Sequence, residues 1–243
     1  MPTRISRILG ALLFAALTVL LAACSVNQVI TIKADGSGTT TMRVVTTKLL
    51  REYITDLQAV TGTAAPANGS IFDVAKLQKD LAARPGLTVK KVASPSPDVL
   101  EVDLGYRSVE EVYGSVESVK KSGLVLYTVS GGQKTLKVHL DRKNFKELAA
   151  VFPAMNGTAF EGIAPQEQDT TTESEYLEMI QFTLGPDGPA ALKASFFDLV
   201  VKPEGTIVSQ TGGTVTNGAV TFRIPLIRVL LLDKPLDYSI VWK

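Results

Sequence analysis

Short turns separate alternating apolar and polar segments along most of this 243-residue chain. The turns are rich in glycine, asparagine, aspartate and proline, which supply the backbone angles of tight β-turns. Residues that alternate between two faces form half-buried strands, and a tight turn joins two such strands in antiparallel order. We therefore expect the chain to fold around a mainly antiparallel sheet.

Five turn motifs indicate where strands reverse direction. Asn217-Gly218 is the strongest, because both residues readily adopt the positive φ angles of a two-residue hairpin turn. Gly131-Gly132 supplies the same freedom. The predicted strand pairs join residues 26–33 to 39–46, 87–94 to 99–106, 124–130 to 133–140, 199–202 to 206–210, and 214–216 to 219–224.

Apolar residues at intervals of three and four positions predict amphipathic helices between the hairpins. Ser108 with Glu111, and Thr172 with Glu175, match the capping box that opens many helices. Together with the hairpins, these segments predict an α+β fold whose helices pack on a curved or barrel-like sheet. The predicted helical segments are residues 49–60, 71–81 (opening after Ser70), 109–119, 145–152 and 173–180.

A polar, glycine-containing break divides the chain. Residues 24–155 form an α+β portion, residues 156–172 a loop or linker, and residues 173–243 a helix followed by a carboxy-terminal β portion. One continuous domain across the break is an equal alternative. Because 45% of the residues are hydrophobic, either arrangement can bury a substantial core.

The first 23 residues have the pattern of a signal peptide. Arg4 and Arg7 precede an apolar stretch of 13 residues, 9–21, which is shorter than the roughly 20 residues needed to cross a bilayer. We therefore expect residues 1–23 to direct export and to be removed from the mature protein.

Leu21-Ala22-Ala23-Cys24 resembles the lipobox of bacterial lipoproteins. The resemblance implies cleavage between Ala23 and Cys24, a diacylglycerol joined to the Cys24 sulfur, and acylation of the new amino terminus. A single acyl chain binds a membrane only reversibly, so two or three chains would give a stable membrane anchor. The alternative is an ordinary secretory signal followed by an incidental Cys24.

Composition excludes several classes of function. Cys24 is the single cysteine, so no internal disulfide forms, and His139 is the single histidine, so a multi-histidine metal site is impossible. After residue 23 the chain has 23 basic and 24 acidic residues, without the basic excess typical of nucleic-acid binding. We expect no metal, no cofactor and no nucleic acid among its ligands.

The sequence contains no recognisable set of catalytic residues. His139 alternates with apolar neighbours, as an exposed strand histidine does. Glu101 with Asp103, and the acidic residues at 173–178, are typical of a solvated strand and of the first turn of a helix. Residues 35–39 are glycine-rich but lack the lysine of a phosphate-binding loop. We predict that the protein is not an enzyme, and a hydrolase of unknown substrate is the third hypothesis.

Residues 225–236, PLIRVLLLDKPL, form an unusually apolar segment that is too short to cross a membrane. Its apolar side chains are candidates for contact with a ligand or a membrane. A buried strand or helix turn is the alternative. The candidates are Leu226, Ile227, Val229, Leu230, Leu231 and Leu232.

Two segments, VITIKADGSGTTTMRV and KPLDYSIVW, resemble bacterial envelope lipoproteins with an LppM-like domain. The resemblance implies an α+β domain with a strongly curved, barrel-like antiparallel sheet and a role in binding envelope lipids or glycolipids. No catalytic residues carry over from it.

The sequence therefore predicts a lipid-anchored, non-enzymatic protein of the bacterial cell envelope. Its predicted role is to bind a hydrophobic ligand, a lipid or glycolipid, or an envelope partner at the membrane surface. A structural or assembly factor for another envelope protein is the alternative. Ser25 occupies the position where an aspartate marks inner-membrane retention in enteric bacteria, and this favours the outer membrane.

Overall fold

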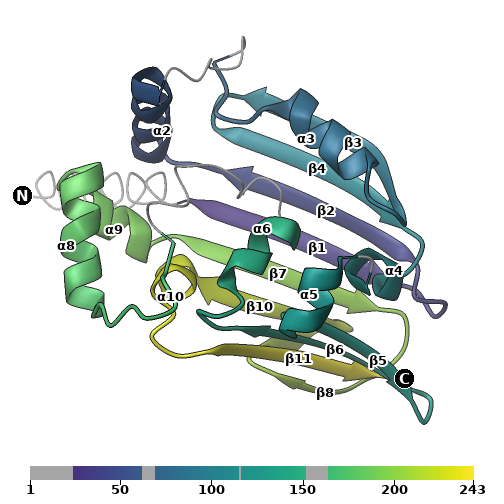
Figure 1. Cartoon of the computed structure of the whole chain (residues 1–243). Helices are drawn as coiled ribbons and strands as arrows, with labels where there is room; N and C mark the ends of the chain where they lie inside the picture. The colour runs from purple at the N-terminus through teal and green to yellow at the C-terminus, as the bar shows by residue number, and fades with distance from the viewer. Residues whose placement is uncertain (1–23, 62–68, 115, 152–163) are drawn as a thin grey trace, which may run out of the picture.

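The computed structural model describes residues 24–61, 69–114, 116–151 and 164–243, so the predicted signal peptide, with Ala23, lies outside the described residues. The described strands form two sheets (Figure 1). The larger contains, in spatial order, β3 (Leu87–Ser96), β4 (Val99–Tyr106), β2 (Gly38–Val45), β1 (Ser25–Ile32), β7 (Phe196–Pro203), β10 (Ala219–Pro225) and β9 (Thr214–Thr216). The smaller contains β5 (Val125–Ser130), β6 (Gln133–Leu140), β11 (Leu236–Trp242) and β8 (Ile207–Thr211).

The α+β class is confirmed, but the barrel-like alternative for the sheet is wrong. The described strands form a mixed seven-stranded sheet and an antiparallel four-stranded sheet, and neither closes into a barrel. The larger sheet is mixed because β1 pairs antiparallel with β2 and parallel with β7. Since β7 follows the predicted linker and β1 precedes it, the two portions of the chain share this sheet.

Four of the five predicted hairpins are confirmed. The pairs β1–β2, β3–β4, β5–β6 and β9–β10 are antiparallel neighbours. Asn217 and Gly218 have φ angles of 50° and 73°, as the turn between β9 and β10 requires. Local turn chemistry is therefore sufficient to predict strand pairs that follow one another in the chain.

The hairpin predicted at residues 199–210 is wrong, because its two strands enter different sheets. β7 pairs with β1 and β10, whereas β8 pairs with β11. Both sheets hold the connecting turn: Glu204 N–H donates to Ile32 O (2.6 Å), and Thr206 and Lys243 exchange two backbone hydrogen bonds (2.8 and 3.1 Å). The chain crosses between the sheets at this turn, which explains why they remain separate.

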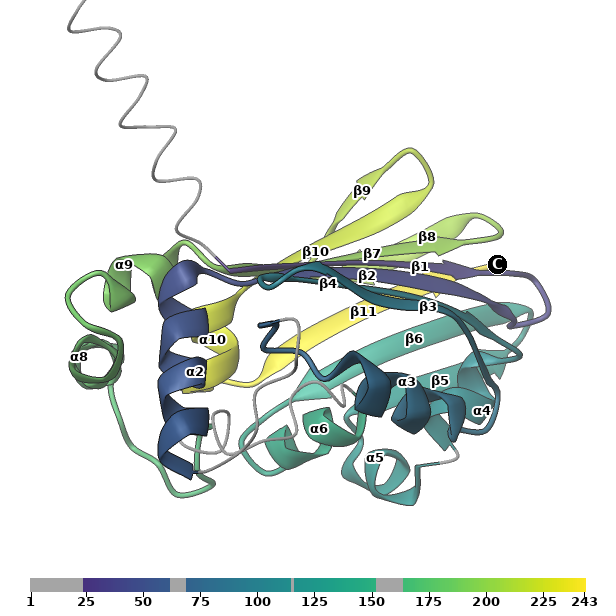
Figure 2. The same ribbon diagram turned by 90° about the horizontal axis from the view of Figure 1, so that it is seen from above.

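The helices are α2 (Lys48–Thr61), α3 (Val74–Ala82), α4 (Val109–Gly114), α5 (Glu117–Ser122), the 3-10 helix η1 (Phe145–Glu147), α6 (Leu148–Val151), α8 (Glu173–Leu184), α9 (Gly188–Lys193) and α10 (Leu226–Leu231). In Figure 2, α3, α5 and α6 lie on the same side of the larger sheet. α2, α8, α9 and α10 gather at the end where β1 and β7 begin (Figures 1 and 2).

The helices predicted at residues 71–81 and 109–119 differ from the observed ones. The helix expected after Ser70 begins after Asp73, whose side chain accepts the Lys76 N–H (2.9 Å), while Ser70 Oγ accepts the Phe72 N–H (3.0 Å) one turn earlier. The segment 109–119 contains two short helices, α4 and α5, with α4 ending at a glycine. Glycine weakens a helix interior, which accounts for the interruption.

Buried apolar side chains form two clusters among the described residues. The larger fills the space between the two sheets and beneath α8, α9 and α10, and includes the fully buried Trp242 and Val201. The smaller lies between the larger sheet and α3, and includes Leu77, Leu81 and Leu100. The core is therefore divided, with its larger part nearest to the second sheet.

Candidate functional site

Cys24 is part of the fold, at the end of the larger sheet where β1 begins (Figure 1). Its backbone N–H donates to Ser195 Oγ (2.9 Å), and its carbonyl accepts the Phe196 N–H (3.2 Å). The next residue, Ser25, already pairs with Phe196 in the sheet. Any group attached to the Cys24 sulfur is therefore held directly against the body of the protein, without linker residues.

Ser195 connects Cys24 to two helices. This side chain is only 2% exposed, and its Oγ donates to the carbonyl of Ala191 in α9 (2.7 Å) while accepting the Cys24 N–H. The Ser195 carbonyl accepts the N–H of Leu226, the first residue of α10 (2.9 Å). Sequence analysis missed this residue, because a serine after a helix is usually exposed and carries no other signal.

The Cys24 sulfur lies beside the start of α2. Cys24 Sγ is 3.9 Å from Oγ1 of the buried Thr47. Thr47 Oγ1 also accepts the Leu50 N–H (3.1 Å), the contact that a helix N-cap residue makes. Cys24 itself is half-buried, between the start of α2 and the first residues of the paired strands β1 and β7.

The apolar candidates from residues 225–236 lie in and around α10. Four of the six are core residues and two are half-buried. The four core residues fit the alternative of a buried helix turn. Only the half-buried pair stays a candidate for contact with a ligand or a membrane. The core residues are Ile227, Leu230, Leu231 and Leu232, at 4–7% exposure, and the half-buried pair is Leu226 and Val229.

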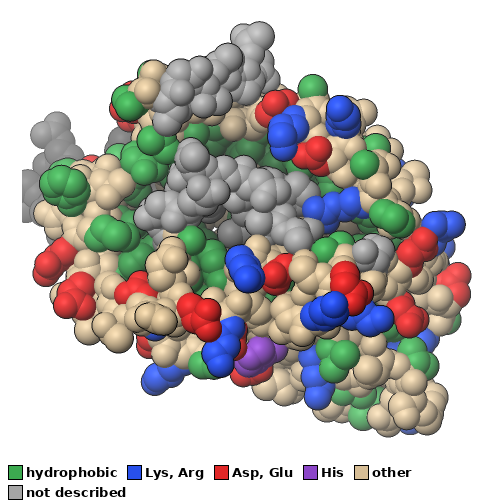
Figure 3. Space-filling view, in the orientation of Figure 1, with side chains coloured by type: hydrophobic (Ala, Val, Ile, Leu, Met, Phe, Trp, Pro, Cys, Tyr) green, Lys and Arg blue, Asp and Glu red, His purple; other side chains and the backbone are tan. Residues whose placement is uncertain are grey.

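α8 exposes large apolar side chains at the same end of the molecule. Phe182 is 94% exposed and Met179 is 37% exposed, whereas Tyr176 and Ile180 are buried. In Figure 3, hydrophobic side chains reach the surface over α8. Leaving a phenylalanine side chain in water forgoes roughly 1.5–3 kcal/mol of burial free energy.

Sequence analysis predicted a helix at residues 173–180, on which Tyr176, Met179 and Ile180 recur at helical spacing as one apolar stripe, and did not single out Phe182. The structure separates them, because Tyr176 and Ile180 share the inner side of the helix and Met179 does not. Met179 and Phe182 are three positions apart, and this helical spacing was the available sequence signal for a second apolar side. We call Met179 and Phe182 the outer face of α8.

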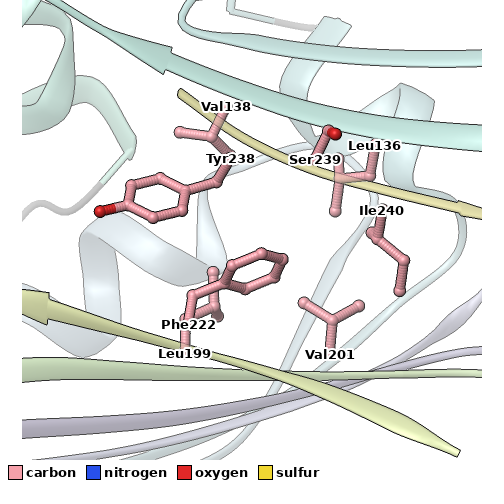
Figure 4. A pocket seen from close by; sticks show the side chains of 8 residues that line it. All are labelled: Leu136, Val138, Leu199, Val201, Phe222, Tyr238, Ser239 and Ile240. Carbon is pink, nitrogen blue, oxygen red and sulfur yellow. The ribbon is translucent and has the colours of Figure 1, made fainter. Parts of the chain in front are cut away.

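Side chains fill the space between the two sheets (Figure 4). Leu199, Val201 and Phe222 of the larger sheet point toward Val138 and Ile240 of the smaller one. The void left between them has a volume of about 10 Å³, enough for one water molecule at most. A lipid has no room there.

His139 and Glu101 contact polar partners on neighbouring strands at the surface. His139 Nδ1 is 2.7 Å from Asp237 Oδ1, and Nε2 is 3.5 Å from Asp141 Oδ2. The hydrogen bond to Asp237 raises the pKa of His139. Glu101 accepts a hydrogen bond from Lys91 Nζ (2.7 Å), which lowers the pKa of Glu101. His139 therefore joins β6 to β11 through a hydrogen bond, and Glu101 joins β4 to β3 through an ion pair.

Within the described ranges, no helix is long and apolar enough to cross a membrane. The same residues contain no group of three or more histidine, cysteine, aspartate or glutamate side chains placed to hold a metal ion. The candidate site consists of Cys24, the residues that hold it, and the outer face of α8.

A solved structure with a similar fold is the NMR structure of the folded domain of LppM from Mycobacterium tuberculosis. The match covers 90% of this chain and 89% of that one, at 11% sequence identity and a TM-score of 0.42. Similarity at this level gives no information on a ligand or an activity. No protein-family model and no curated protein matches the sequence.

Proposed function

We propose that the chain is a lipid-anchored protein of the bacterial envelope whose body lies directly on the bilayer that holds Cys24. The observation that carries this proposal is the position of Cys24, whose backbone N–H and carbonyl are both hydrogen-bonded into the fold. A diacylglycerol on its sulfur would have no linker between itself and the sheet. The protein surface around Cys24 would then meet the lipid headgroups.

The contact with Ser195 is compatible with the mature form of a lipoprotein. Cleavage before Cys24 frees its nitrogen, and acylation converts that nitrogen to an amide that keeps one hydrogen. This N–H can still donate to Ser195 Oγ, 2.9 Å away. The anchor can therefore be completed without releasing the first residue from the fold. Ser25, in the second mature position, leads us to propose the outer membrane as its location.

Mass spectrometry of the mature amino-terminal peptide tests the anchor. We expect a peptide that begins at Cys24 and carries a diacylglyceryl group on sulfur and an acyl chain on nitrogen. Cys24→Ala is the control and should lose the lipid and the membrane association together. A mature peptide with an unmodified thiol would overturn the proposal.

We further infer a binding role without catalysis, and a protein partner is favoured over a lipid held between the two sheets. The void of about 10 Å³ between the sheets cannot hold a lipid. β8 and β9 follow each other in the chain, are edge strands of the two sheets, and expose Val208 and Val215. Edge strands with exposed apolar side chains readily pair with another chain. An assembly factor for another envelope protein fits this surface.

Photocrosslinking in cells distinguishes the two binding roles. A photoreactive residue in place of Val208 should give one stoichiometric protein adduct, and the same residue in place of the exposed Glu52 on α2 should not. Absence of an adduct at Val208, together with a lipid that stays bound in native mass spectrometry, would favour a hydrophobic ligand instead. Loss of a measured hydrolytic activity in His139→Ala would support the third hypothesis, an enzyme.

A further inference from the structure

α8 presents an apolar surface that its own packing does not use. Tyr176 and Ile180 fill the core side of the helix, while Met179 and Phe182 form the exposed outer face. Residues 179–186, MIQFTLGP, contain no charged side chain, although the six residues before them include three glutamates. The first half of α8 is therefore acidic and the second half is uncharged, which makes the second half better suited to an apolar environment.

Contacts connect this helix to Cys24. α8 packs against α9 so closely that a Cβ atom on Gly188, the first residue of α9, would lie 3.0 Å from the Ile180 carbonyl oxygen. α9 leads into Ser195, whose Oγ accepts the Cys24 N–H. Figures 1 and 2 show α8, α9 and the start of β1 at the same end of the molecule. A bilayer that holds Cys24 therefore lies at the end where the outer face of α8 is exposed.

We propose that the outer face of α8 inserts into the headgroup layer of the bilayer that holds Cys24, as a second membrane contact that fixes the orientation of the protein. An aromatic ring and a flexible thioether suit this layer, since both gain from leaving water. The inference rests on the proposed anchor, because the anchor brings the bilayer to this end. With both contacts made, the sheets can no longer rotate about Cys24.

The acidic residues of α8 determine which lipid headgroups can lie against its outer face. Glu173, Glu175 and Glu178 place negative charge beside the outer face, and only Glu173 has a cation nearby among the ion pairs of the helix, Lys193 at 3.6 Å. Anionic headgroups would be repelled by this charge. The contact therefore favours zwitterionic lipids such as phosphatidylethanolamine over phosphatidylglycerol.

The single natural cysteine makes a selective test possible. In the lipidated protein Cys24 has no free thiol, so Phe182→Cys, or Met179→Cys with Phe182 retained, provides one site for a nitroxide spin label. Val129→Cys is the matched control, because Val129 is also exposed and apolar and lies on β5, away from Cys24 in Figure 1. The full mature protein is placed in vesicles of phosphatidylethanolamine and phosphatidylcholine, with or without phosphatidylglycerol.

The measured quantity is the accessibility of each label to oxygen, which enriches in lipid, relative to a polar nickel complex. Labels at positions 179 and 182 should show a ratio severalfold higher than the label at position 129, and phosphatidylglycerol should reduce the difference. Equal ratios on vesicle-bound protein would overturn the second contact while leaving the anchor intact.

Two other outcomes would also overturn the inference. Protection of the α8 labels in unlipidated Cys24→Ala protein, without vesicles and with a dimeric mass in light scattering, would mean that a second copy covers the outer face. An unmodified Cys24 in the mature peptide would remove both the anchor and the second contact, and the peptide mass identifies that case separately.

Discussion

α3 and α8 have similar caps and similar inner sides, but their outer surfaces differ. Asp73 caps α3 by accepting the Lys76 N–H, and Thr172 caps α8 through a reciprocal capping box with Glu175. Each helix buries two side chains on its inner side. On the outer side, α3 carries an ion pair between Lys76 and Asp80 (2.9 Å), whereas α8 carries Met179 and Phe182.

The comparison shows that a buried inner side and a cap are needed to hold such a helix, whereas an apolar outer side is not. Two buried side chains and one cap are sufficient to hold the nine-residue α3 on the protein with a polar outer side. The apolar outer face of α8 is therefore not explained by folding. The second membrane contact proposed above assigns this face to the bilayer that would hold Cys24.

The largest expected effect concerns the inner sides, where the helices should behave alike. Leu81→Ala in α3 and Ile180→Ala in α8 should each lower the free energy of unfolding by about 2–5 kcal/mol, because both side chains are buried and their removal leaves a cavity. Urea unfolding of the unlipidated protein measures this. A loss below about 1 kcal/mol for Ile180→Ala would mean that α8 is not held by its inner side.

The caps should have a smaller and again similar effect. Asp73→Ala and Thr172→Ala should each cost about 1 kcal/mol of unfolding free energy, because each removes the acceptor of a backbone N–H in the first turn. Thr172→Ser, which keeps the hydroxyl, is the control and should retain most of the stability. An unchanged urea midpoint for Thr172→Ala would show that the capping box contributes nothing.

A substitution on the outer face of α8 should change its membrane contact and leave the stability of the protein almost unchanged. Phe182→Gln should alter the unfolding free energy by no more than about 0.5 kcal/mol, because the ring is exposed in the folded protein. The same variant should weaken the protection of a spin label at position 179 in vesicles. If Phe182→Gln instead destabilises the protein as much as a buried substitution, the ring packs within the chain and the comparison fails.

The smallest expected effect is a dependence on pH at the start of α8. Hydrogen bonds from the Thr172 backbone N–H and hydroxyl lower the pKa of Glu175 in the folded protein. A lowered pKa means that Glu175 adds stability above its unfolded pKa and loses this contribution as the pH falls through its folded pKa. Amide exchange in the first turn of α8 should therefore accelerate under acid conditions, and Glu175→Gln should remove the part of that change that comes from Glu175.

Sequence reasoning succeeded where the relevant partners are close in the chain. Asn217-Gly218 determines a hairpin by its own backbone angles, and Thr172 with Glu175 forms the predicted capping box. It failed at residues 199–210, because the destination of β8 depends on Lys243, at the far end of the chain. The parallel pairing of β1 with β7 likewise has no local signal.

The same limit applies to the candidate site. Cys24 could be predicted from the pattern of residues before it. Its support by Ser195 could not, because a buried serine between a helix and a strand looks like any surface serine in the sequence. The exposure of Phe182 depends on which side of α8 meets α9, and that is decided by packing of distant segments.

The parallel pairing of β1 with β7 also determines how much of the chain must be synthesised before the larger sheet can form completely. Cys24 and Ser195, which are joined by a hydrogen bond, are 171 positions apart. A ribosome must therefore synthesise about four-fifths of the chain before the strand after Cys24 gains its second neighbour. Until then, β1 has an open edge on the side that β7 occupies in the finished sheet.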